Sequence, residues 1–413
     1  MLQLEGSKAA AHVEALANRV GRLESVEPVV RGIVAAVRQE GDAALRRLAA
    51  QFDGLKKQES LRVPENELKA ALKSLPIDLC KALKEAAGNI RRFAESQLPK
   101  PWMRGQSGVR AGQIVRPLQS VGCYVPGGRY PLPSTLLMTV IPAQVAGVER
   151  ICVVSPQPRA ETLAAAALLG VKEFYRIGGA QAVAALAYGS RSIAPVNKIV
   201  GPGNLYVTAA KKLVAFDCGI DFLAGPTEAL IVQHAGRADF IAADLVAQAE
   251  HDPEAVCIFI TSSRTLANSV LNELTLQSAN NPTAQVSLQE NGAILIASSR
   301  QQAMQWANRI ASEHLTVEEC DLPLVRNAGS VFISPYSAQA AGDYIVGPNH
   351  VLPTAGVARS RGGLTVLDFL KVITVQHLSQ QGIRHVGPAA IRLAQAEGLA
   401  AHAESLRLRV QNA

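Results

Sequence analysis

Apolar and polar positions alternate with the period of helices over the first part of the chain. After Pro28, apolar residues recur at three- and four-residue steps as far as Phe52, and Gly54 ends the segment. Pro64 stands where the first turn of another helix would begin, followed by acids that the helix dipole favours there. These spacings predict a helical N-terminal region over residues 1–113.

From Gly112 onward, short runs rich in β-branched residues alternate with Ala-rich helical segments. The runs lie at residues 121–125, 151–154, 174–177, 198–200, 230–232, 257–260, 294–296 and 331–333. Segments such as AETLAAAALLG between them suit the crossover helices of a parallel sheet. This pattern predicts an α/β fold with two Rossmann-like domains, residues 114–226 and 227–345. Both are incomplete in the sense that neither carries the GxGxxG fingerprint.

The alternation stops before the end of the chain. Residues 346–413 contain glycine-rich loops and one long helical pattern, AAIRLAQAEGLAAHAESLRLRV, which is too short to form a core of its own. We therefore expect a C-terminal helical arm that packs on something else.

Composition excludes several classes of protein. The 413 residues are 48% hydrophobic and 18% charged, which excludes a disordered chain. Charged residues interrupt every apolar stretch before the roughly 18 residues that a membrane span needs, so no membrane span is expected. Glu5 and Lys8 stand where a secretory signal needs an apolar core, which indicates a cytoplasmic protein. The six cysteines form no CxxC pair and are expected to be reduced and mostly buried.

The net charge of +7 admits nucleic acid as a partner. The basic residues are not clustered, however, and no aromatic residues are interleaved with them as a stacking surface. Solvated helix faces explain the charge better, so no nucleic-acid partner is expected.

Glycines follow three of the predicted strands of the first α/β domain, in the loops 126–128, 178–181 and 201–204. Ligands of parallel sheets bind at the carboxyl ends of strands. Bare backbone amides at a helix N-terminus suit an anion such as a pyrophosphate. One such loop alone is more often a tight turn, but three at corresponding strand ends make a nucleotide-sized ligand a reasonable hypothesis.

Two pairs of polar residues are candidates for chemistry. Gln248 and His251 are three residues apart on a predicted helix and could reach one ligand together, although a structural role is commoner for this spacing. Glu313 and His314 place a carboxylate and an imidazole at an element boundary. An imidazole can take a proton from an alcohol, and a carboxylate can activate a water molecule. From spacing alone, a helix end remains the more frequent explanation of this second pair.

Taken together, the sequence resembles the histidinol dehydrogenase family from about residue 25 to the C-terminus. Seven motifs follow the order of that family: VGCYVPGGRYPLPSTLLM (121–138), GPGNLYVTAAKK (201–212), AGPTEALIV (224–232), DLVAQAEHDP (244–253), SEHL (312–315), AGDYIVGPNHVLPT (341–354) and EGLAAHAESLRLRV (397–410). The resemblance implies a zinc-dependent, NAD-linked, four-electron oxidation of L-histidinol through L-histidinal to L-histidine, the last steps of histidine biosynthesis.

The resemblance also implies roles for individual residues. His314 would be the general base, and Glu313 would activate water. The implied zinc ligands are Gln248, His251, Asp343 and His402. The implied NAD positions are Tyr124, Gln181 and Asn204. The implied substrate positions are Thr227, Gln248, His251, His314, Asp343, Glu397 and His402, with His350 beside them.

Members of this family are homodimers in which the C-terminal segment reaches into the neighbouring subunit. The resemblance therefore implies that residues 346–413 pack on the partner subunit and that Glu397 and His402 serve the partner's site. Thr227 stands where the family usually has serine, which leaves open a paralogous NAD-dependent dehydrogenase of another polar alcohol. A non-catalytic binding module is a third alternative. The presence of both Glu313 and His314 beside the ligand positions argues against it.

Overall fold

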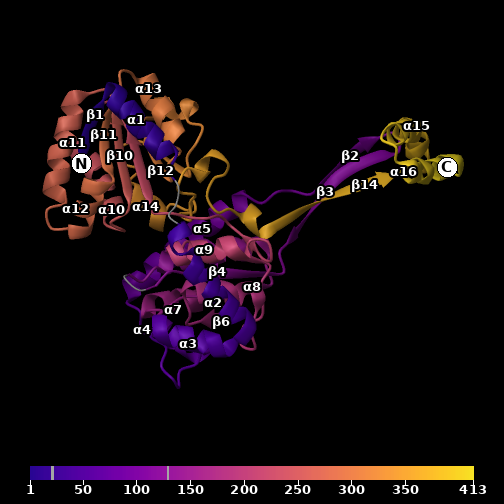
Figure 1. Cartoon of the computed structure of the whole chain (residues 1–413), viewed down its shortest axis with the longest axis horizontal. Coiled ribbons are helices and arrows are strands. Elements are labelled where there is room, and N and C mark those ends of the chain that lie inside the picture. The colour runs from indigo at the N-terminus through magenta and orange to yellow at the C-terminus, as the bar shows by residue number, and fades with distance from the viewer. Residues whose placement is uncertain (20–22, 128–129) are drawn as a thin grey trace.

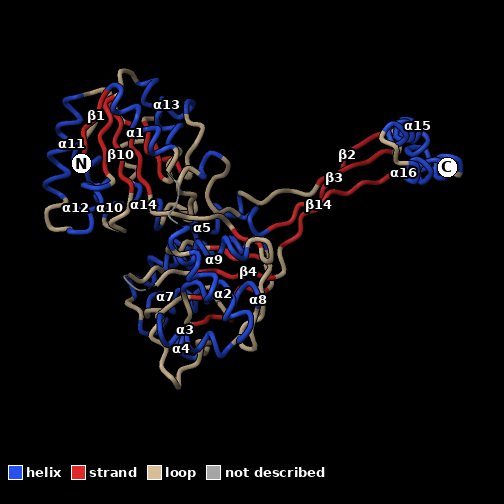
Figure 2. The backbone as a smooth tube through the Cα atoms, viewed as in Figure 1, coloured by secondary structure: helices blue, strands red, loops and turns tan. Residues whose placement is uncertain are grey.

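The computed structural model describes residues 1–19, 23–127 and 130–413. Two units, each a parallel sheet between helices, form the body of the molecule, and a narrow arm projects away from them to the C-terminus (Figure 1). Strands run through the centre of each unit and along the arm (Figure 2). The predicted α/β fold class is thus confirmed. Gly128, in the first of the glycine loops, lies outside the described residues.

The first unit is built on five parallel strands in the order β6-β5-β4-β7-β8. Their bounds are β4 (Ser120–Tyr124), β5 (Arg150–Val154), β6 (Glu173–Tyr175), β7 (Lys198–Val200) and β8 (Gly219–Ile220). One face is covered by α4 (Glu65–Ser74), α5 (Ile77–Ser96), α6 (Pro133–Ala146) and α7 (Ala160–Leu168). The other is covered by α2 (Glu27–Glu40), α3 (Asp42–Phe52), α8 (Gly179–Tyr188) and α9 (Leu205–Val214). Alternate residues of β4 enter the two layers, with Cys123 on the α6 side and Tyr124 on the α8 side.

The second unit has six parallel strands in the order β1-β11-β10-β9-β12-β13. Their bounds are β1 (Leu2–Glu5), β9 (Glu228–Val232), β10 (Val256–Thr261), β11 (Gly292–Ile296), β12 (His314–Val317) and β13 (Ser330–Ile333). Helices α1 (Gly6–Ala17) and α13 (Arg300–Ile310) cover one face, and α10 (Ala238–Ala249), α11 (Arg264–Gln277) and α12 (Pro282–Glu290) the other. Apart from β1, the two sheets have the same strand order. In each, the strand that comes first in sequence (β4 or β9) is central, the next two strands lie on one side of it and the last two on the other.

The N-terminal region differs from the wholly helical region expected over residues 1–113. Residues Leu2–Glu5 form β1, which pairs with β11 at the edge of the second sheet, and α1 packs on the same unit. Residues Trp102–Gln106 form β2, and Val109–Pro117 form β3. A four-residue strand is too short to show a period, and its partner lies almost three hundred residues away, so no local pattern could reveal the pairing.

The arm is a three-stranded antiparallel sheet that carries two helices. Strand β14 (Leu370–Leu378) pairs with β3, which pairs with β2 on its other side. The helices α15 (Gln380–Ala396) and α16 (Ala400–Gln411) lie at the tip (Figure 1). Val351, Leu364 and Phe369 are buried in the core of the first unit, so the chain leaves the body only near Leu370. The expected arm is therefore shorter than residues 346–413.

Two other expectations concern the whole chain. Four of the six free cysteines are buried, Cys80 is half-buried and Cys320 is exposed, in keeping with the expected thiols. Among the described residues, no helix combines the length and the hydrophobicity needed to cross a membrane.

Candidate active site

A cavity of about 570 Å³ lies between the two units and collects most of the sequence-predicted residues. From the first unit it is lined by Pro126 and by residues 202–206, which follow the carboxyl ends of β4 and β7. From the second unit it is lined by Thr227, Glu313 and His314, which stand at the amino ends of β9 and β12. The rule that ligands bind at carboxyl ends thus holds for the first sheet only.

Glu313 is buried at the base of this cavity, just before β12. Its Oε2 accepts a hydrogen bond of 2.6 Å from the hydroxyl of Thr227 and one of 2.8 Å from the backbone N–H of Glu228. Because both donors bind Oε2, the orientation of the carboxylate is fixed. Neither of these two bonds uses Oε1, which can accept a hydrogen bond from a ligand.

His314 is the first residue of β12 and is also buried. Its Nδ1 lies 3.2 Å from the carbonyl oxygen of Glu228, its Nε2 lies 3.2 Å from Oδ1 of Asp343, and its ring stacks on Phe332. Burial lowers the pKa of His314, but the carboxylates of Glu313 and Asp343 outweigh it and raise the pKa to about 10. The imidazole is therefore held on both nitrogens and oriented by an acid on each side.

Asp343 lies on α14 (Gln339–Tyr344), between His314 and two more histidines, His350 and His251. Glu313 and His314 are called the dyad below. Burial raises its pKa, but the hydrogen bond to His314 and the charges of His314, His350 and His251 outweigh burial and keep the pKa below its usual range. The carbonyl oxygen of Asp343 lies 2.7 Å from Nδ1 of His350, whose Nε2 lies 3.2 Å from the hydroxyl of Thr135 on α6. His350, which was predicted with the substrate positions, therefore contacts both units.

Gln248 and His251 approach the same cavity from α10. The helix ends at Ala249, and the N–H of His251 donates to the carbonyl of Gln248 at 3.3 Å. His251 therefore lies in the turn after the helix and not on the helix itself, but both side chains still line the cavity. The side-chain Nε2 of Gln248 donates to the hydroxyl of Thr227. Because this bond uses the amide nitrogen of Gln248, its amide oxygen remains available as a metal ligand.

Three of the four predicted zinc ligands thus line one cavity: Gln248, His251 and Asp343. An amide oxygen, an imidazole and a carboxylate are a donor set that suits zinc, and they leave positions for further ligands. The fourth, His402, lies exposed on α16, as does Glu397 between α15 and α16. Both are at the tip of the arm, away from the cavity of their own chain (Figure 1).

The three predicted NAD positions lie at the carboxyl ends of the first sheet, at different depths. Asn204 lines the cavity and caps α9, since its side chain accepts from the N–H groups of Tyr206 and Val207. Tyr124 and Gln181 are buried below the surface. The hydroxyl of Tyr124 accepts from the N–H of Gly179, a residue with φ of +59°.

Asp53, which was not predicted from the sequence, is buried at the end of α3. Its Oδ2 accepts hydrogen bonds of 3.0 Å from the N–H of Gly178 and from Nε2 of Gln181. Burial raises the pKa of Asp53, and these two bonds oppose that rise. Asp53 therefore anchors the second glycine loop from a helix more than a hundred residues earlier, and no local signal marks it.

Glu228 and Arg19 were not predicted either. They form an ion pair next to Glu313 and His314. Glu228 stands in the motif AGPTEALIV directly after Thr227, so its position was a signal that could have been followed. Arg19 lies before residue 25, where the resemblance begins, and nothing in the local sequence points to it.

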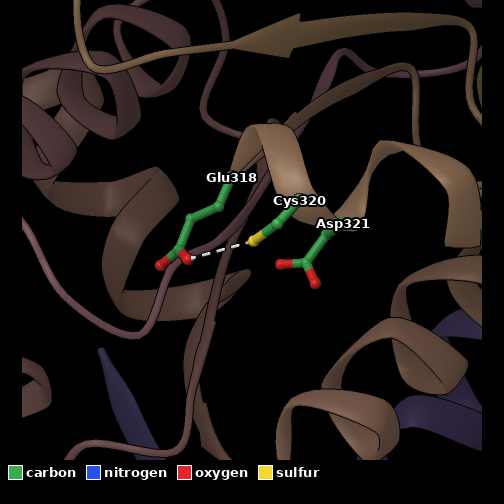
Figure 3. A group of neighbouring side chains, drawn as sticks. All are labelled: Glu318, Cys320 and Asp321. Atoms are coloured by element: carbon green, nitrogen blue, oxygen red, sulfur yellow. Dashed lines mark hydrogen bonds between the residues drawn. The ribbon is translucent and has the colours of Figure 1, made fainter.

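Glu318, Cys320 and Asp321 form a separate group of possible metal ligands after the carboxyl end of β12 (Figure 3). His314 lies at the opposite end of that strand. The guanidinium of Arg300 already lies among them, 2.5 Å from Glu318, 2.7 Å from the sulfur of Cys320 and 3.0 Å from Asp321. The arginine supplies the positive charge that these groups need, so we do not assign a metal there.

Comparisons with known proteins point to one family. The model of the histidinol dehydrogenase family matches residues 17–410. A histidinol dehydrogenase of Methanothermobacter thermautotrophicus is 46% identical over 399 residues, covering 93% of either chain. One of Brucella suis is 45% identical over 401 residues, covering 94% of this chain and 93% of its own. The crystal structure of histidinol dehydrogenase from Elizabethkingia anophelis gives a TM-score of 0.94 at 32% identity, covering 100% of this chain and 98% of that one.

Proposed function

Because this chain belongs to the histidinol dehydrogenase family, we propose that it oxidises L-histidinol through L-histidinal to L-histidine with NAD as the hydride acceptor. The observation that carries the proposal is the buried dyad of Glu313 and His314, whose Oε2 and Nδ1 lie 3.6 Å apart in a cavity shared with three predicted zinc ligands. The proposal includes a homodimer and a cytoplasmic location, which the sequence suggests.

His314 acts as the general base in both halves of the reaction. The carbonyl of Glu228 accepts from Nδ1, so we assign the substrate proton to Nε2, which lies 3.2 Å from Oδ1 of Asp343. Asp343 would release this nitrogen when its carboxylate serves as a zinc ligand. The same nitrogen acts twice, because a hydrated aldehyde is again an alcohol that loses a proton and a hydride.

Glu313 activates water in the second half of the reaction. Thr227 and the backbone of Glu228 hold Oε2, so we assign Oε1 to the water that adds to the aldehyde. A carboxylate fixed at one oxygen keeps its orientation while the other oxygen accepts a proton.

Gln248, His251 and Asp343, together with His402 of the partner subunit, are the residues that would hold zinc. When bound, zinc supplies a positive charge that draws in the polar groups of the amino alcohol and lowers the pKa of neighbouring groups such as His314. Asn204 lines the cavity from the first unit and would face NAD there, and Tyr124 and Gln181 support the neighbouring loop at Gly178 and Gly179.

We expect the purified protein to form about two NADH per histidinol, because the base and the water-activating carboxylate stand in one site. Treatment with a chelator should abolish turnover, and zinc should restore it. Counting NADH by absorbance, and histidine by chromatography, tests both points. One NADH per substrate, or full activity in metal-free protein, contradicts the proposed mechanism.

A second candidate is a paralogous dehydrogenase of another polar alcohol, which Thr227 favours. The hydroxyl of Thr227 donates to Glu313 and accepts from Gln248, as the hydroxyl of a serine would. Threonine, however, adds a methyl group beside the substrate. Comparing kcat/KM for histidinol with that for other amino alcohols separates the two functions, and Thr227→Ser is the matched variant.

Asp53→Ala is expected to raise the KM for NAD by about tenfold or more with a smaller change in kcat, because two charge-assisted hydrogen bonds are lost. The reason is that Asp53 holds both Gly178 and Gln181 at the proposed coenzyme loop. Asp42→Ala on the same helix is the control, since Asp42 accepts its hydrogen bonds from Ser190 and Ser192 at the other end of α3. An unchanged KM for NAD in a folded Asp53→Ala protein would show that this anchor does not serve the coenzyme.

A further inference from the structure

We infer that the buried ion pair between Arg19 and Glu228 positions the catalytic dyad, so that the N-terminal segment of the chain controls the rate of the chemical step. This inference rests on the proposed function, because it takes Glu313 and His314 as the reacting groups. Neither Arg19 nor Glu228 lines the cavity. Both are positioning residues.

Glu228 contacts both members of the dyad through its backbone. Its N–H donates to Oε2 of Glu313 at 2.8 Å, and its carbonyl oxygen lies 3.2 Å from Nδ1 of His314. A displacement of this one peptide segment would therefore move the fixed oxygen of the acid and the fixed nitrogen of the base together.

The side chain of Glu228 ties down the segments on either side of it. Its Oε2 accepts from the N–H of Glu313 at 3.2 Å, and its Oε1 accepts from the N–H of Ala355 at 2.8 Å. Glu228 and Glu313 thus exchange two bonds, each donating its N–H to the other's carboxylate. Ala355 lies in the stretch that passes between the two units, so the same carboxylate also joins the cavity wall to β9.

Arg19 supplies the counter-charge for this carboxylate. Its Nε lies 2.6 Å from Oε1 and its Nη2 lies 2.5 Å from Oε2, the two-pronged arrangement that fixes a carboxylate in one plane. The exposed fractions of the two side chains are 16% for Arg19 and 4% for Glu228. Arg19 also donates to the carbonyl of Ile310, three residues before the dyad.

Burial raises the pKa of Glu228, the pair with Arg19 opposes this rise, and the neighbouring charge of Glu313 adds to it. A buried carboxylate such as that of Glu228 needs a counter-charge beside it. Arg19 supplies that charge, and it contacts Glu228 from just beyond the end of α1.

Glu228→Gln and Arg19→Gln each break the pair, and each is expected to lower kcat about 10- to 100-fold while the KM for histidinol and NAD and the zinc content stay within about twofold. Arg19→Lys keeps the charge but cannot form the fork, so its kcat should lie between those of wild type and Arg19→Gln. The measurements are steady-state kinetics, metal analysis and thermal unfolding on the full-length zinc-loaded protein.

Glu173→Gln is the matched control, because Glu173 forms the same two-pronged pair with Arg150 at 2.8 and 2.9 Å at the opposite end of the first sheet. It should lower the unfolding temperature and leave kcat unchanged. A merely structural role for Arg19 and Glu228 would give their variants this same behaviour, with wild-type kcat, and would overturn the inference.

Two further outcomes are decisive. If the glutamine variants do not fold, Arg19→Lys settles the question, since a selective loss of kcat supports the inference and wild-type kcat refutes it. If wild-type protein oxidises no histidinol at all, the proposed function fails instead, and this failure is seen before any variant is compared.

Discussion

Replacing His314 by asparagine is expected to lower kcat by about 10²- to 10⁴-fold, the usual contribution of a positioned general base, with little loss of zinc. Asparagine retains a side-chain amide that can still donate to the carbonyl of Glu228, as Nδ1 does now. It has no atom in the place of Nε2, which takes the substrate proton in the proposed reaction. The loss should therefore fall on kcat rather than on binding.

His251→Asn is the comparison that gives this result its meaning. His251 is exposed at the cavity and is one of the proposed zinc ligands, so its loss should remove metal and substrate affinity together. Metal analysis beside steady-state kinetics distinguishes the two variants. If both retained zinc and wild-type rates, the roles assigned to these two histidines would be wrong.

The predictable part of the fold is the part encoded by local periodicity. The apolar runs at 121–125 and 257–260 became β4 and β10, because strands buried on both faces are recognisable as short continuous apolar segments. The arm was harder to delimit. Strand β14 is largely exposed and pairs with β3 across more than two hundred and fifty residues, so neither burial nor spacing marks it.

The candidate site likewise contains residues that could be predicted from the sequence and residues that could not. Gln248, Asp343, Glu313 and His314 were proposed from motifs, and the structure brings them to one cavity. Asp53 and Arg19 were not found, since each contacts a distant segment of the chain from just beyond the end of a helix and shows no motif of its own. Their contribution depends on long-range packing, which neither helical periodicity nor the spacing of polar residues reports.

A heterodimer of one Glu313→Gln chain and one His402→Ala chain is expected to recover about half of the wild-type activity, although each homodimer should be inactive. His402 lies exposed on α16, at the tip of an arm that leads away from the cavity of its own chain (Figure 1). If the arm serves the partner, one site of the heterodimer combines a native Glu313 with a native His402, and the other site carries both substitutions.

The two chains can be co-expressed with different affinity tags and purified through both, so that only heterodimers are assayed. An arm that folded back onto its own chain would place one substitution in each site, and the heterodimer would be as inactive as the homodimers. Zinc content gives an independent reading, because His402→Ala removes a proposed ligand whereas Glu313→Gln does not. With exchanged arms, the site that lacks this ligand is the one that also carries Glu313→Gln, so activity and bound zinc should be retained together in the other site. Full zinc loading without activity would instead show that His402 is not a ligand of either site.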